Sequence, residues 1–387
     1  MRVLAAFDKF RDSVSAPAAC DIAASAIAGA RPGWQVDSCP LADGGEGFAD
    51  ILTRAAGGDV VRLAVAGPRG GEVAAAFGVV SIDKIPRGAR ALLGVVAGPK
   101  GRVAIVEMAA ASGLSLLDPG MRDPMLASSG GTGQLIRAAG GAGVDAIILG
   151  VGGSATNDLG LGALGALGVE FAAGSGERID PAVPAKWPVI ERISGSVPDS
   201  LPPILIACDV DNPLLGPRGA ASVYGPQKGL RAADAGGLER ESARLAGMLC
   251  RHFGRPDSLA LVPGAGAAGG TAFGLMAAAG ARLLPGFGLF SAWVDLDERL
   301  AAADIVITGE GRFDGTSLSG KGPGTVVKRA LARGKAVHVF AGEVSLREEI
   351  PGLTAHAITP AGMPLAEALA AAPGLLLASV KRAFGPG

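Results

Sequence analysis

Short apolar runs alternate with helical patterns at the amino end of the chain. Arg2–Phe7 is a mostly apolar run, typical of a buried strand. Ala16–Ala30 has an Ala-rich helical pattern, and Ser15 before it is a suitable N-cap. Gln35–Leu41 and Gly47–Ala56 repeat the order of strand and helix. This alternation predicts a parallel sheet with right-handed crossover connections.

The carboxyl end of the chain shows the same alternation. Phe287–Ala302 has a helical pattern, and Asp304–Thr308 is a short apolar run that predicts a strand. Val337–Phe340 and His356–Ile358 are further expected strands, each followed by a helix. The two ends of the chain therefore share one kind of local architecture.

The middle of the chain begins with a different pattern. Short apolar runs follow one another across Gly and Pro turns, without helices between them, which favours antiparallel strands in a separate layer or domain. Later segments predict strands at Val144–Leu149 and Pro203–Ala207 and an amphipathic helix at Leu238–Cys250. The four early runs are Val60–Ala66, Val73–Val80, Ala91–Ala97 and Val103–Met108.

Composition narrows the function classes. The 387 residues include 62 glycines and 26 prolines, which gather in short loops. A net charge of −1, 4% aromatic residues and no long basic run argue against nucleic-acid or membrane-surface partners. The longest uncharged stretch, Leu259–Ala281, is too interrupted for a membrane span. Without a signal-peptide layout or a Cys-x-x-Cys pair, we expect a cytoplasmic protein without structural zinc or disulfides.

Glycine loops that carry carboxylates are the candidate chemistry. Leu41–Gly47 reads Leu-Ala-Asp-Gly-Gly-Glu-Gly, between an expected strand and an expected helix. Glycine lets backbone N–H groups approach an anion closely, and a carboxylate in the same turn can hold a cation. We therefore interpret Asp43 and Glu46 as parts of a loop for a metal-bound phosphate.

Two similar loops follow later strands. Gly150–Asp158 combines glycines with hydroxyl and amide side chains before a helix, so it is a second candidate anion site. The alternative there is a tight turn in which Asp158 caps the helix. Asp209 and Asp211 stand two residues apart at the end of another strand and could share a divalent cation. The alternative is an Asx turn before Pro213.

Two further glycine patterns and three lysines are candidate contacts for a nucleotide or a phosphate. Gly264–Gly270 contains Gly-x-Gly-x-x-Gly, but the acidic residue of a dinucleotide site is absent about twenty positions on. Gly315–Lys321 resembles a Walker A loop but lacks the Ser or Thr that binds magnesium. Lys9, Lys228 and Lys321 stand in polar or Gly-rich loops. They are candidate phosphate contacts, with solvated loop lysines as the alternative.

Taken together, these motifs resemble the glycerate kinase type-1 family, the bacterial glycerate 2-kinases. The resemblance covers nearly the whole chain, and the motifs follow one another in the family's order. The matching stretches are Asp8–Phe10, Ala42–Gly47, Glu107–Leu114, Gly152–Asp158, Cys208–Leu214, Tyr224–Gly229, Pro263–Gly270 and Thr308–Arg312.

The resemblance implies a fold and an activity. It implies a flavodoxin-like parallel-sheet domain built from both chain ends, expected at residues 1–66 plus 286–387, and an inserted mixed α/β domain at residues 67–285. It implies ATP-dependent phosphorylation of D-glycerate, at the 2-hydroxyl in bacterial members, with Mg²⁺. We expect the active site in a cleft between the two domains. We expect a cytoplasmic organic-acid kinase with D-glycerate and ATP as partners, and no nucleic acid or membrane; a homodimer stays open.

Three positions depart from the family pattern. Arg11 and Asp12 stand where the family usually has Lys and Gly, and Leu159 stands where Gly usually follows the aspartate of the middle loop. Arg11 keeps a positive charge, although arginine does not simply replace lysine. Asp12 adds a negative charge beside the expected site, which leaves substrate choice open.

The motifs and the resemblance together define a candidate site. Its metal would be held by Asp43 and Glu46 or by Asp209 and Asp211, and an aspartate among Asp43, Asp209 and Asp314 would accept the proton of the hydroxyl group. The catalytic candidates are Asp43, Asp209, Lys9 and Arg312. The substrate and nucleotide candidates are Asp8, Arg11, Gly44, Gly45, Glu46, Gly153, Ser154, Thr156, Asn157, Asn212, Lys228, Gly266, Gly309, Glu310, Asp314 and Lys321.

Three other functions stay open from the sequence. The chain could be a kinase for another small hydroxy acid, given Arg11 and Asp12. It could be an NAD-dependent oxidoreductase that uses Gly264–Gly269. It could also be a non-catalytic ligand sensor, against which the carboxylates in glycine loops argue.

Overall fold

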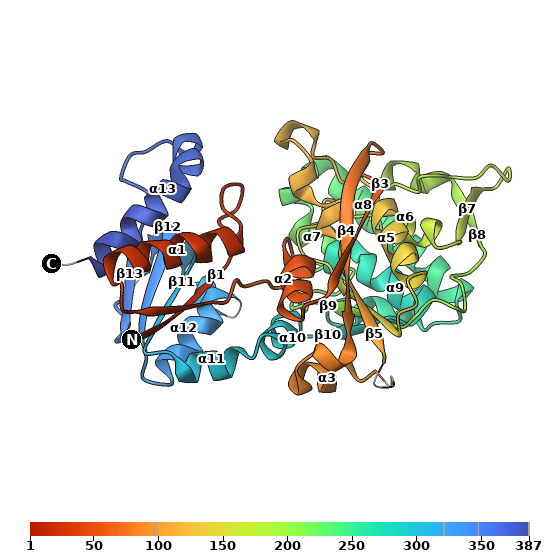
Figure 1. Cartoon of the computed structure of the whole chain (residues 1–387). Helices are drawn as coiled ribbons and strands as arrows, with labels where there is room; N and C mark the ends of the chain where they lie inside the picture. Colours follow the sequence, from red (N-terminus) through yellow and green to blue (C-terminus); the bar gives the residue numbers. More distant parts are fainter. Residues whose placement is uncertain (96–97, 99, 320–321, 347, 386–387) are drawn as a thin grey trace. The chain divides into compact units, whose positions relative to one another are not determined.

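A computed structural model describes the chain except residues 96, 97, 99, 320, 321, 347, 386 and 387 (Figure 1). It divides into two compact units. The terminal unit comprises Met1–Asp43 and Phe290–Gly387, and the inserted unit comprises Gly44–Leu289. The boundary expected at residue 66 falls later than this division, because residues 59–66 pair with the second strand of the inserted unit.

The terminal unit is built on a five-stranded parallel sheet of order β13-β12-β11-β1-β2. Read along the chain, this is the flavodoxin order 2-1-3-4-5. Helices α1 and α13 pack on one face, and α11 and α12 on the other. The strands are β1 (Arg2–Phe7), β2 (Gln35–Ser38), β11 (Ile305–Asp314), β12 (Ala336–Ser345) and β13 (Leu353–Ala357), and the helices are α1 (Ala16–Ala30), α11 (Leu296–Ala302), α12 (Pro323–Leu331) and α13 (Leu365–Phe384).

Local sequence explains the elements of this unit. Ser15 Oγ accepts a hydrogen bond from the Ala18 amide and so caps α1 as expected. The apolar residues of β1 are buried, as a central strand covered on both faces requires. Phe7 and Phe340 from β1 and β12 lie against each other in the core with ring centroids 6.4 Å apart.

The inserted unit is built on a six-stranded mixed sheet of order β10-β9-β6-β5-β4-β3. The β3–β4 and β4–β5 pairs are antiparallel, as predicted, and the other three are parallel. The strands are β3 (Asp59–Ala66), β4 (Glu72–Ser81), β5 (Arg102–Glu107), β6 (Ala146–Gly150), β9 (Ile204–Ala207) and β10 (Arg282–Leu284), and β7 (Glu170–Ala173) and β8 (Ile190–Ser194) form a separate ribbon.

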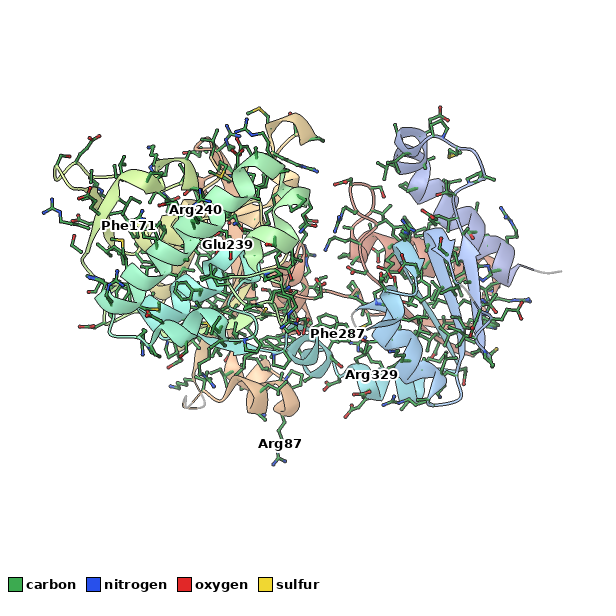
Figure 2. The ribbon with its side chains drawn as sticks, turned by 180° about the vertical axis from the view of Figure 1, so that it is seen from behind. Arg87, Phe171, Glu239, Arg240, Phe287 and Arg329 are labelled. Carbon is green, nitrogen blue, oxygen red and sulfur yellow. The ribbon has the colours of Figure 1, made fainter. Side chains whose placement is uncertain are left out.

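Helices complete one continuous core in the inserted unit. Phe171 of β7 is buried in this core, and Arg87 at the start of α3 points away from it (Figure 2). The helices are α2 (Phe48–Ala55), α3 (Arg87–Leu93), α4 (Ala109–Ser112), α5 (Gly130–Gly140), α6 (Leu161–Ala166), α7 (Ala220–Tyr224), α8 (Ala232–His252) and α9 (Thr271–Ala279); α10 (Gly286–Trp293) contains the second division between the units.

Four expectations about elements were wrong. A helix was expected after Val337–Phe340, but within the described residues β12 leads to β13 without one. The run Ala91–Ala97 is not a strand: its first residues end α3, and residues 96 and 97 lie outside the described part of the chain. The single helix expected at Phe287–Ala302 is broken at Asp295, which has a left-handed backbone with φ 49°. The strand expected at Asp304–Thr308 does not end at Thr308: β11 continues to Asp314, because its later residues pair with β12.

The predicted fold class is confirmed. Both units are α/β, and the unit built from both chain ends has a wholly parallel sheet. No helix within the described residues is both long enough and apolar enough to span a bilayer.

Candidate active site

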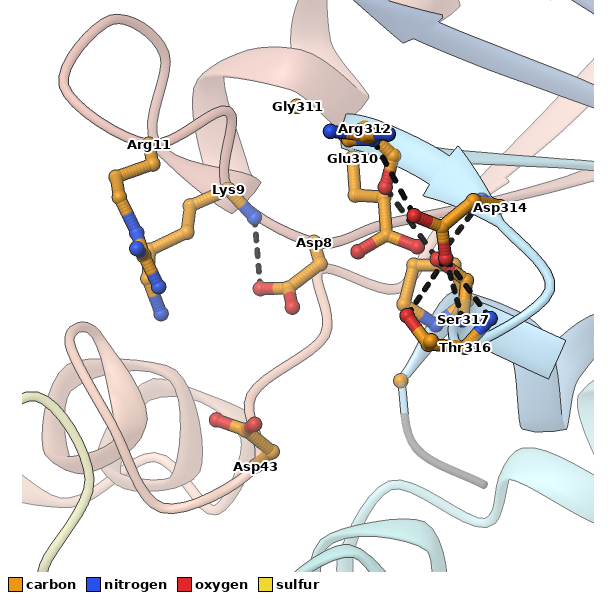
Figure 3. Close-up of a pocket in the computed structure, with 12 residues that line it drawn as sticks. Asp8, Lys9, Arg11, Asp43, Glu310, Gly311, Arg312, Asp314, Thr316 and Ser317 are labelled. Atoms are coloured by element: carbon orange, nitrogen blue, oxygen red, sulfur yellow. Dashed lines mark hydrogen bonds and ion pairs between the residues drawn. The ribbon is translucent and has the colours of Figure 1, made fainter. Parts of the chain in front are cut away.

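A polar pocket lies at the carboxyl ends of the central strands in the terminal unit (Figure 3). Asp8 follows β1, and Glu310 and Arg312 are on β11, its neighbour in the sheet. The strand order reverses between β1 and β11, which is where open α/β sheets bind ligands. The pocket encloses about 820 Å³, enough for a small organic acid or a phosphate chain.

Both signs of charge line this pocket. It brings together seven predicted site residues that are far apart in the sequence. They include Arg312, whose Nε is 3.2 Å from Asp314 Oδ2 and whose Nη2 is 3.8 Å from Glu343 Oε1. The seven are Asp8, Lys9, Arg11, Asp43, Glu310, Arg312 and Asp314. Gly309, also a predicted site residue, lies directly before Glu310 on β11.

Asp314 closes a turn at the edge of the pocket. Its Oδ1 accepts hydrogen bonds from the Thr316 amide at 2.8 Å and from Thr316 Oγ1 at 2.6 Å. These bonds lower the pKa of Asp314, so the carboxylate stays charged. Thr316 and Ser317 also line the pocket, and the sequence reading missed them. The run Asp-Gly-Thr-Ser, a typical Asx turn, was the available signal.

Glu310 is the carboxylate of the pocket whose pKa is raised. Burial, and then the charges of Asp8, Asp314 and Asp43, raise its pKa to about 7, against a hydrogen bond with Ser317 that lowers it. Its Oε1 is buried and has no hydrogen-bond partner in the described structure. A carboxylate in this position is stabilised when it binds a proton or a cation.

The carboxylates of the pocket could bind a magnesium ion whose other ligands are phosphate oxygens and water. Nowhere in the described chain do three His, Cys, Asp or Glu side chains form a metal-binding group. Mg²⁺ commonly uses only one or two protein carboxylates, together with water and phosphate oxygens. The crowded carboxylates and the unpartnered Glu310 oxygen suit that kind of site.

A second group of predicted residues meets in the inserted unit, at the carboxyl ends of β5, β6 and β9. Here glycine permits close backbone contact between two loops. The Gly152 amide donates to Gly44 O at 2.9 Å, and a Cβ on Gly152 would lie 2.7 Å from Gly45 Cα. Glu46 lies beside Gly153, and Glu107 Oε2 accepts the Ala49 amide at 3.2 Å. The loop that begins α2 is therefore fixed against the loop after β6.

The loop after β6 is held from inside by buried polar groups. Lys228 Nζ donates to Ser154 Oγ at 2.9 Å and to Thr156 O at 2.6 Å. Asp158 accepts from Ser129 N and Oγ and from the amides of Gly160 and Gly162. Lys228 is thus not a solvated loop lysine, and Asp158 ties the loop to the start of α5.

The loop after β9 does not direct its two aspartates to one point. Asp209 Oδ2 accepts the Phe287 amide at 2.7 Å. The Asp211 side chain is 77% exposed and lies 3.6 Å from Arg218. Asn212 Nδ2 donates to Arg218 O at 2.7 Å. A cation shared by Asp209 and Asp211 stays a prediction.

The glycines of the dinucleotide-like pattern have a packing role. A Cβ on Gly266 would lie 2.3 Å from Pro213 O, and one on Gly269 would lie 2.2 Å from Thr156 O. The pattern follows the 3₁₀ turn Asp257–Leu261 and not a strand. Support for an NAD site is therefore lost, since the fingerprint requires a strand before the glycines.

Two predictions about the site remain as they were. Lys321 lies outside the described residues. A cleft that combines the residues of both units stays a prediction, as does the metal set Asp43, Glu46, Asp209 and Asp211.

Comparisons with known proteins give one consistent family. A family model described as the glycerate kinase family matches residues 3–385. A glycerate kinase from Bacillus subtilis is 36% identical over 374 residues, which cover 95% of this chain and 93% of that protein. A glycerate 2-kinase from Escherichia coli is 35% identical over 362 residues, covering 92% of this chain and 89% of that protein.

A solved structure leads to the same family. A provisionally named glycerate kinase 2 from Salmonella typhimurium aligns with a TM-score of 0.74 and 34% identity, over 99% of this chain and 97% of that one. The resemblance inferred from the motifs, and the prediction of an enzyme of that kind, are confirmed. Because the family model and these relatives cover nearly its whole length, this chain belongs to the glycerate kinase family.

Proposed function

We propose that the chain transfers the γ-phosphate of ATP to D-glycerate in the presence of Mg²⁺ and that the product is 2-phospho-D-glycerate. Relatives named glycerate kinase and glycerate 2-kinase match almost the full chain, which supports both the reaction and the position. A cytoplasmic location and a homodimer stay predictions.

The observation that carries this proposal is the charge layout of the terminal-unit pocket. Phosphoryl transfer needs positioning and charge neutralisation more than covalent chemistry. Lys9, Arg11 and Arg312 are suited to phosphate and carboxylate oxygens, and the guanidinium groups can bind them through two parallel hydrogen bonds. The opposite charges in the same pocket are suited to a metal ion.

The carboxylates of this pocket would hold the magnesium ion. Asp8, Asp43 and Glu310 are the groups we assign to it, because all three line the pocket and because burial, together with the charges of Asp8 and Asp43, raises the pKa of Glu310. When bound, Mg²⁺ neutralises phosphate charge. Glu46, Asp209 and Asp211 belong to the inserted unit, and their assignment to a metal rests on the sequence alone.

One coupled assay tests the proposal. The purified protein is mixed with D-glycerate, ATP and Mg²⁺, ADP formation is followed, and the phosphate is located in the product by ³¹P and ¹H NMR. We expect glycerate-dependent ADP formation and 2-phospho-D-glycerate. A 3-phosphate product would correct the position, and ADP formation that does not depend on any hydroxy acid would overturn the reaction.

The residues at positions 11 and 12 support a second candidate function, a kinase for a related hydroxy acid. Arg11 lines the pocket, and Asp12, the next residue in the sequence, carries a negative charge, at positions where the family usually has Lys and Gly. A kinase for a related hydroxy acid would suit such a change. Comparable kcat/KM values for glycerate and for tartronate or erythronate would favour this second function.

A further inference from the structure

Lys228 is a buried lysine in the inserted unit, at the end of the 3₁₀ turn Pro226–Lys228. Only 3% of its surface is exposed. Its Nζ lies 2.6 Å from Thr156 O, and this carbonyl can only accept, so it fixes the direction of the amine. Ser154 Oγ, at 2.9 Å, is the second partner. The amine therefore lies behind a serine hydroxyl and is oriented by a third group.

The environment of Lys228 favours the uncharged amine. Burial lowers its pKa to about 7, and the charge of Asp158 opposes this only in part. Asp158 is itself held by donors from Ser129, Gly160 and Gly162. The other groups that contact the amine, the Ser154 hydroxyl and the Thr156 carbonyl, are neutral. Close to neutral pH, Lys228 can thus both accept and release a proton.

The same loop has polar atoms that nothing in the described chain satisfies. Thr156 Oγ1 and Asn157 Oδ1 are buried and have no hydrogen-bond partner there. Ser154 itself is 7% exposed, and its neighbour Gly153 is exposed. A loop with unmet hydrogen-bonding capacity and an exposed edge is suited to receive a ligand's polar group.

We infer that Ser154 and Lys228 form a proton-transfer pair for the substrate hydroxyl. This inference rests on the kinase function proposed above. A hydroxyl within reach of a desolvated lysine that a third group orients is the arrangement that activates serine in other enzyme classes. Here it serves to take a proton from the alcohol that receives the phosphate.

The aspartates considered from the sequence are less suited to this task. Asp314 accepts hydrogen bonds from Thr316 and Ser317, which lower its pKa and make it a weak base. Asp209 accepts the Phe287 amide. Asp43 lies among the carboxylates that we assign to the metal.

Phosphoryl transfer through this pair needs only the substrate alcohol and the nucleoside triphosphate. The substrate hydroxyl proton moves to Ser154 Oγ while the serine proton moves to the neutral Lys228 Nζ, which becomes an ammonium. The substrate oxygen forms a bond to the γ-phosphorus of the nucleoside triphosphate. The bond from that phosphorus to the bridging oxygen breaks, and its electron pair leaves with the diphosphate.

The pH dependence of turnover tests the pair. Since the uncharged amine is the active form, kcat should rise with pH through an apparent pKa near 7. Ser154→Ala and Lys228→Ala should each lower kcat at least about 100-fold, the lower end for general-base catalysis. The double variant should be no slower than either single variant, because the two groups act as one. Lys186→Ala, which removes an exposed lysine of the same unit, should leave kcat unchanged.

Chemical rescue separates proton transfer from a structural role. Small primary amines should restore turnover of Lys228→Ala in proportion to the free-base concentration, with a rate that depends on the amine's pKa. If Lys228→Ala does not fold, Lys228→Arg and Ser154→Ala carry the test, and both should lose the limb near pH 7. A limb that persists unchanged in these variants would overturn the pair, as would a phosphoserine at Ser154 in the wild type.

Activity on different hydroxy acids separates the kinase function from the proton-transfer pair. The measurements use whichever hydroxy acid the wild type accepts. A wild type inactive on glycerate but active on another acid contradicts the substrate proposed above and still tests the pair. An active wild type with kcat unaltered by Ser154→Ala overturns the pair and leaves the kinase function intact.

Discussion

Glu310 offers a test of the pocket at the scale of one residue. Its pKa is raised from 4.5 to about 7, so the folded protein holds this proton more tightly than the unfolded chain. That contribution to stability is complete below pH 4.5 and is lost as pH rises through about 7. We expect Glu310→Gln to remove the loss. Between pH 5 and pH 8, the free energy of unfolding should fall by about 1–2 kcal/mol more in the wild type, after a discount for partial exposure.

Urea unfolding of both proteins in metal-free buffer measures this difference. Added Mg²⁺ should reduce it, because a cation neutralises the same carboxylates. Equal changes in the two proteins from pH 5 to pH 8 would show that the Glu310 carboxyl titrates normally.

Asp43 is the second residue whose role can be tested singly. It lines the pocket after β2, and we assign it to the metal. Asp43→Asn should lower kcat/KM by at least about 100-fold, as loss of a group that positions charge in phosphoryl transfer typically does. The thermal unfolding midpoint should stay within a few degrees. Asp21→Asn, on the exposed side of α1, is the matched control, and equal activities for the two variants would remove Asp43 from the mechanism.

The sequence predicts which residues of the glycine loops are candidates for the site, but it does not predict their burial or the charges around them. The loop sequence made Lys228 a candidate phosphate contact, but its burial depends on packing against a loop about seventy residues away, which the local sequence does not indicate. Glu310 has a raised pKa because it is buried and because the charges of Asp8 and Asp43, from the loops after β1 and β2, lie near it. Long-range electrostatics of this kind has no local sequence signal.

At the scale of elements, the contact between the loops after β6 and before α2 can be broken selectively. A Cβ on Gly152 would lie 2.7 Å from Gly45 Cα, so Gly152→Ala must push the two loops apart. We expect at least a ten-fold loss of kcat/KM with the unit still folded. Gly165→Ala is the control, since nothing lies within 4 Å of its added Cβ in α6. It should stabilise by about 0.5–1 kcal/mol. Full activity of Gly152→Ala would show that this contact does not position the site.

The pairing of β12 with β13 gives a prediction about acid stability. His338 Nδ1 lies 3.0 Å from His356 Nε2, and Phe384 of α13 packs on His338 with centroids 4.9 Å apart. Burial, with the charge of His356, lowers the pKa of His338 to about 4. Its stabilising contribution is present above pH 6.5 and is lost as pH falls through about 4.

Substituting this histidine should flatten the acid limb. In His338→Gln, the fall in unfolding free energy from pH 7 to pH 4.5 should be smaller than in the wild type by roughly 1–2 kcal/mol, since the ring is partly solvated. Guanidinium unfolding at the two pH values measures it. An unchanged fall would mean that the neutral histidine pair does not contribute to stability.

Elements were predicted well where one periodicity dominates. Arg2–Phe7 and Ala16–Ala30 match β1 and α1 because burial and capping are local. The apolar run in the sequence ends at Thr308, whereas β11 continues to Asp314 because β12 supplies partners there. The Ala91–Ala97 run has apolar residues typical of a strand, yet Arg87–Leu93 is helical. Short apolar runs do not distinguish the two structures.

At the scale of the whole molecule, the sheet order of the terminal unit could not come from periodicity. β1 pairs with β11, about 300 residues away, and this pairing creates the switch point and its pocket. The resemblance to a family supplied the discontinuous organisation. The division at Asp43 and Gly44 lies inside the loop that the sequence treated as one motif. Its aspartate and its glycines thus belong to different units, and one local pattern carries residues for two separate tasks.

The chain's departures from the family pattern share a physical feature that yields the last prediction. Asp12 and Leu159 both have left-handed backbones, with φ of 60° and 55°, at positions where the family usually has glycine. Glycine adopts this conformation without a Cβ penalty. Asp12→Gly should therefore stabilise the terminal unit by about 1 kcal/mol. It also removes a negative charge beside Arg11, which should lower KM for an anionic acid by about 2- to 5-fold.

Asp12→Asn separates the two effects, since asparagine keeps a side chain at the left-handed position but has no charge. It should reproduce the change in KM and leave stability nearly unaltered. Thermal unfolding and KM for glycerate at low salt measure the two quantities. If Asp12→Asn leaves KM unchanged while Asp12→Gly lowers it, the loop's conformation and not its charge controls the substrate. If neither variant alters KM, the aspartate does not act on the pocket, and the choice among hydroxy acids must lie elsewhere in the molecule.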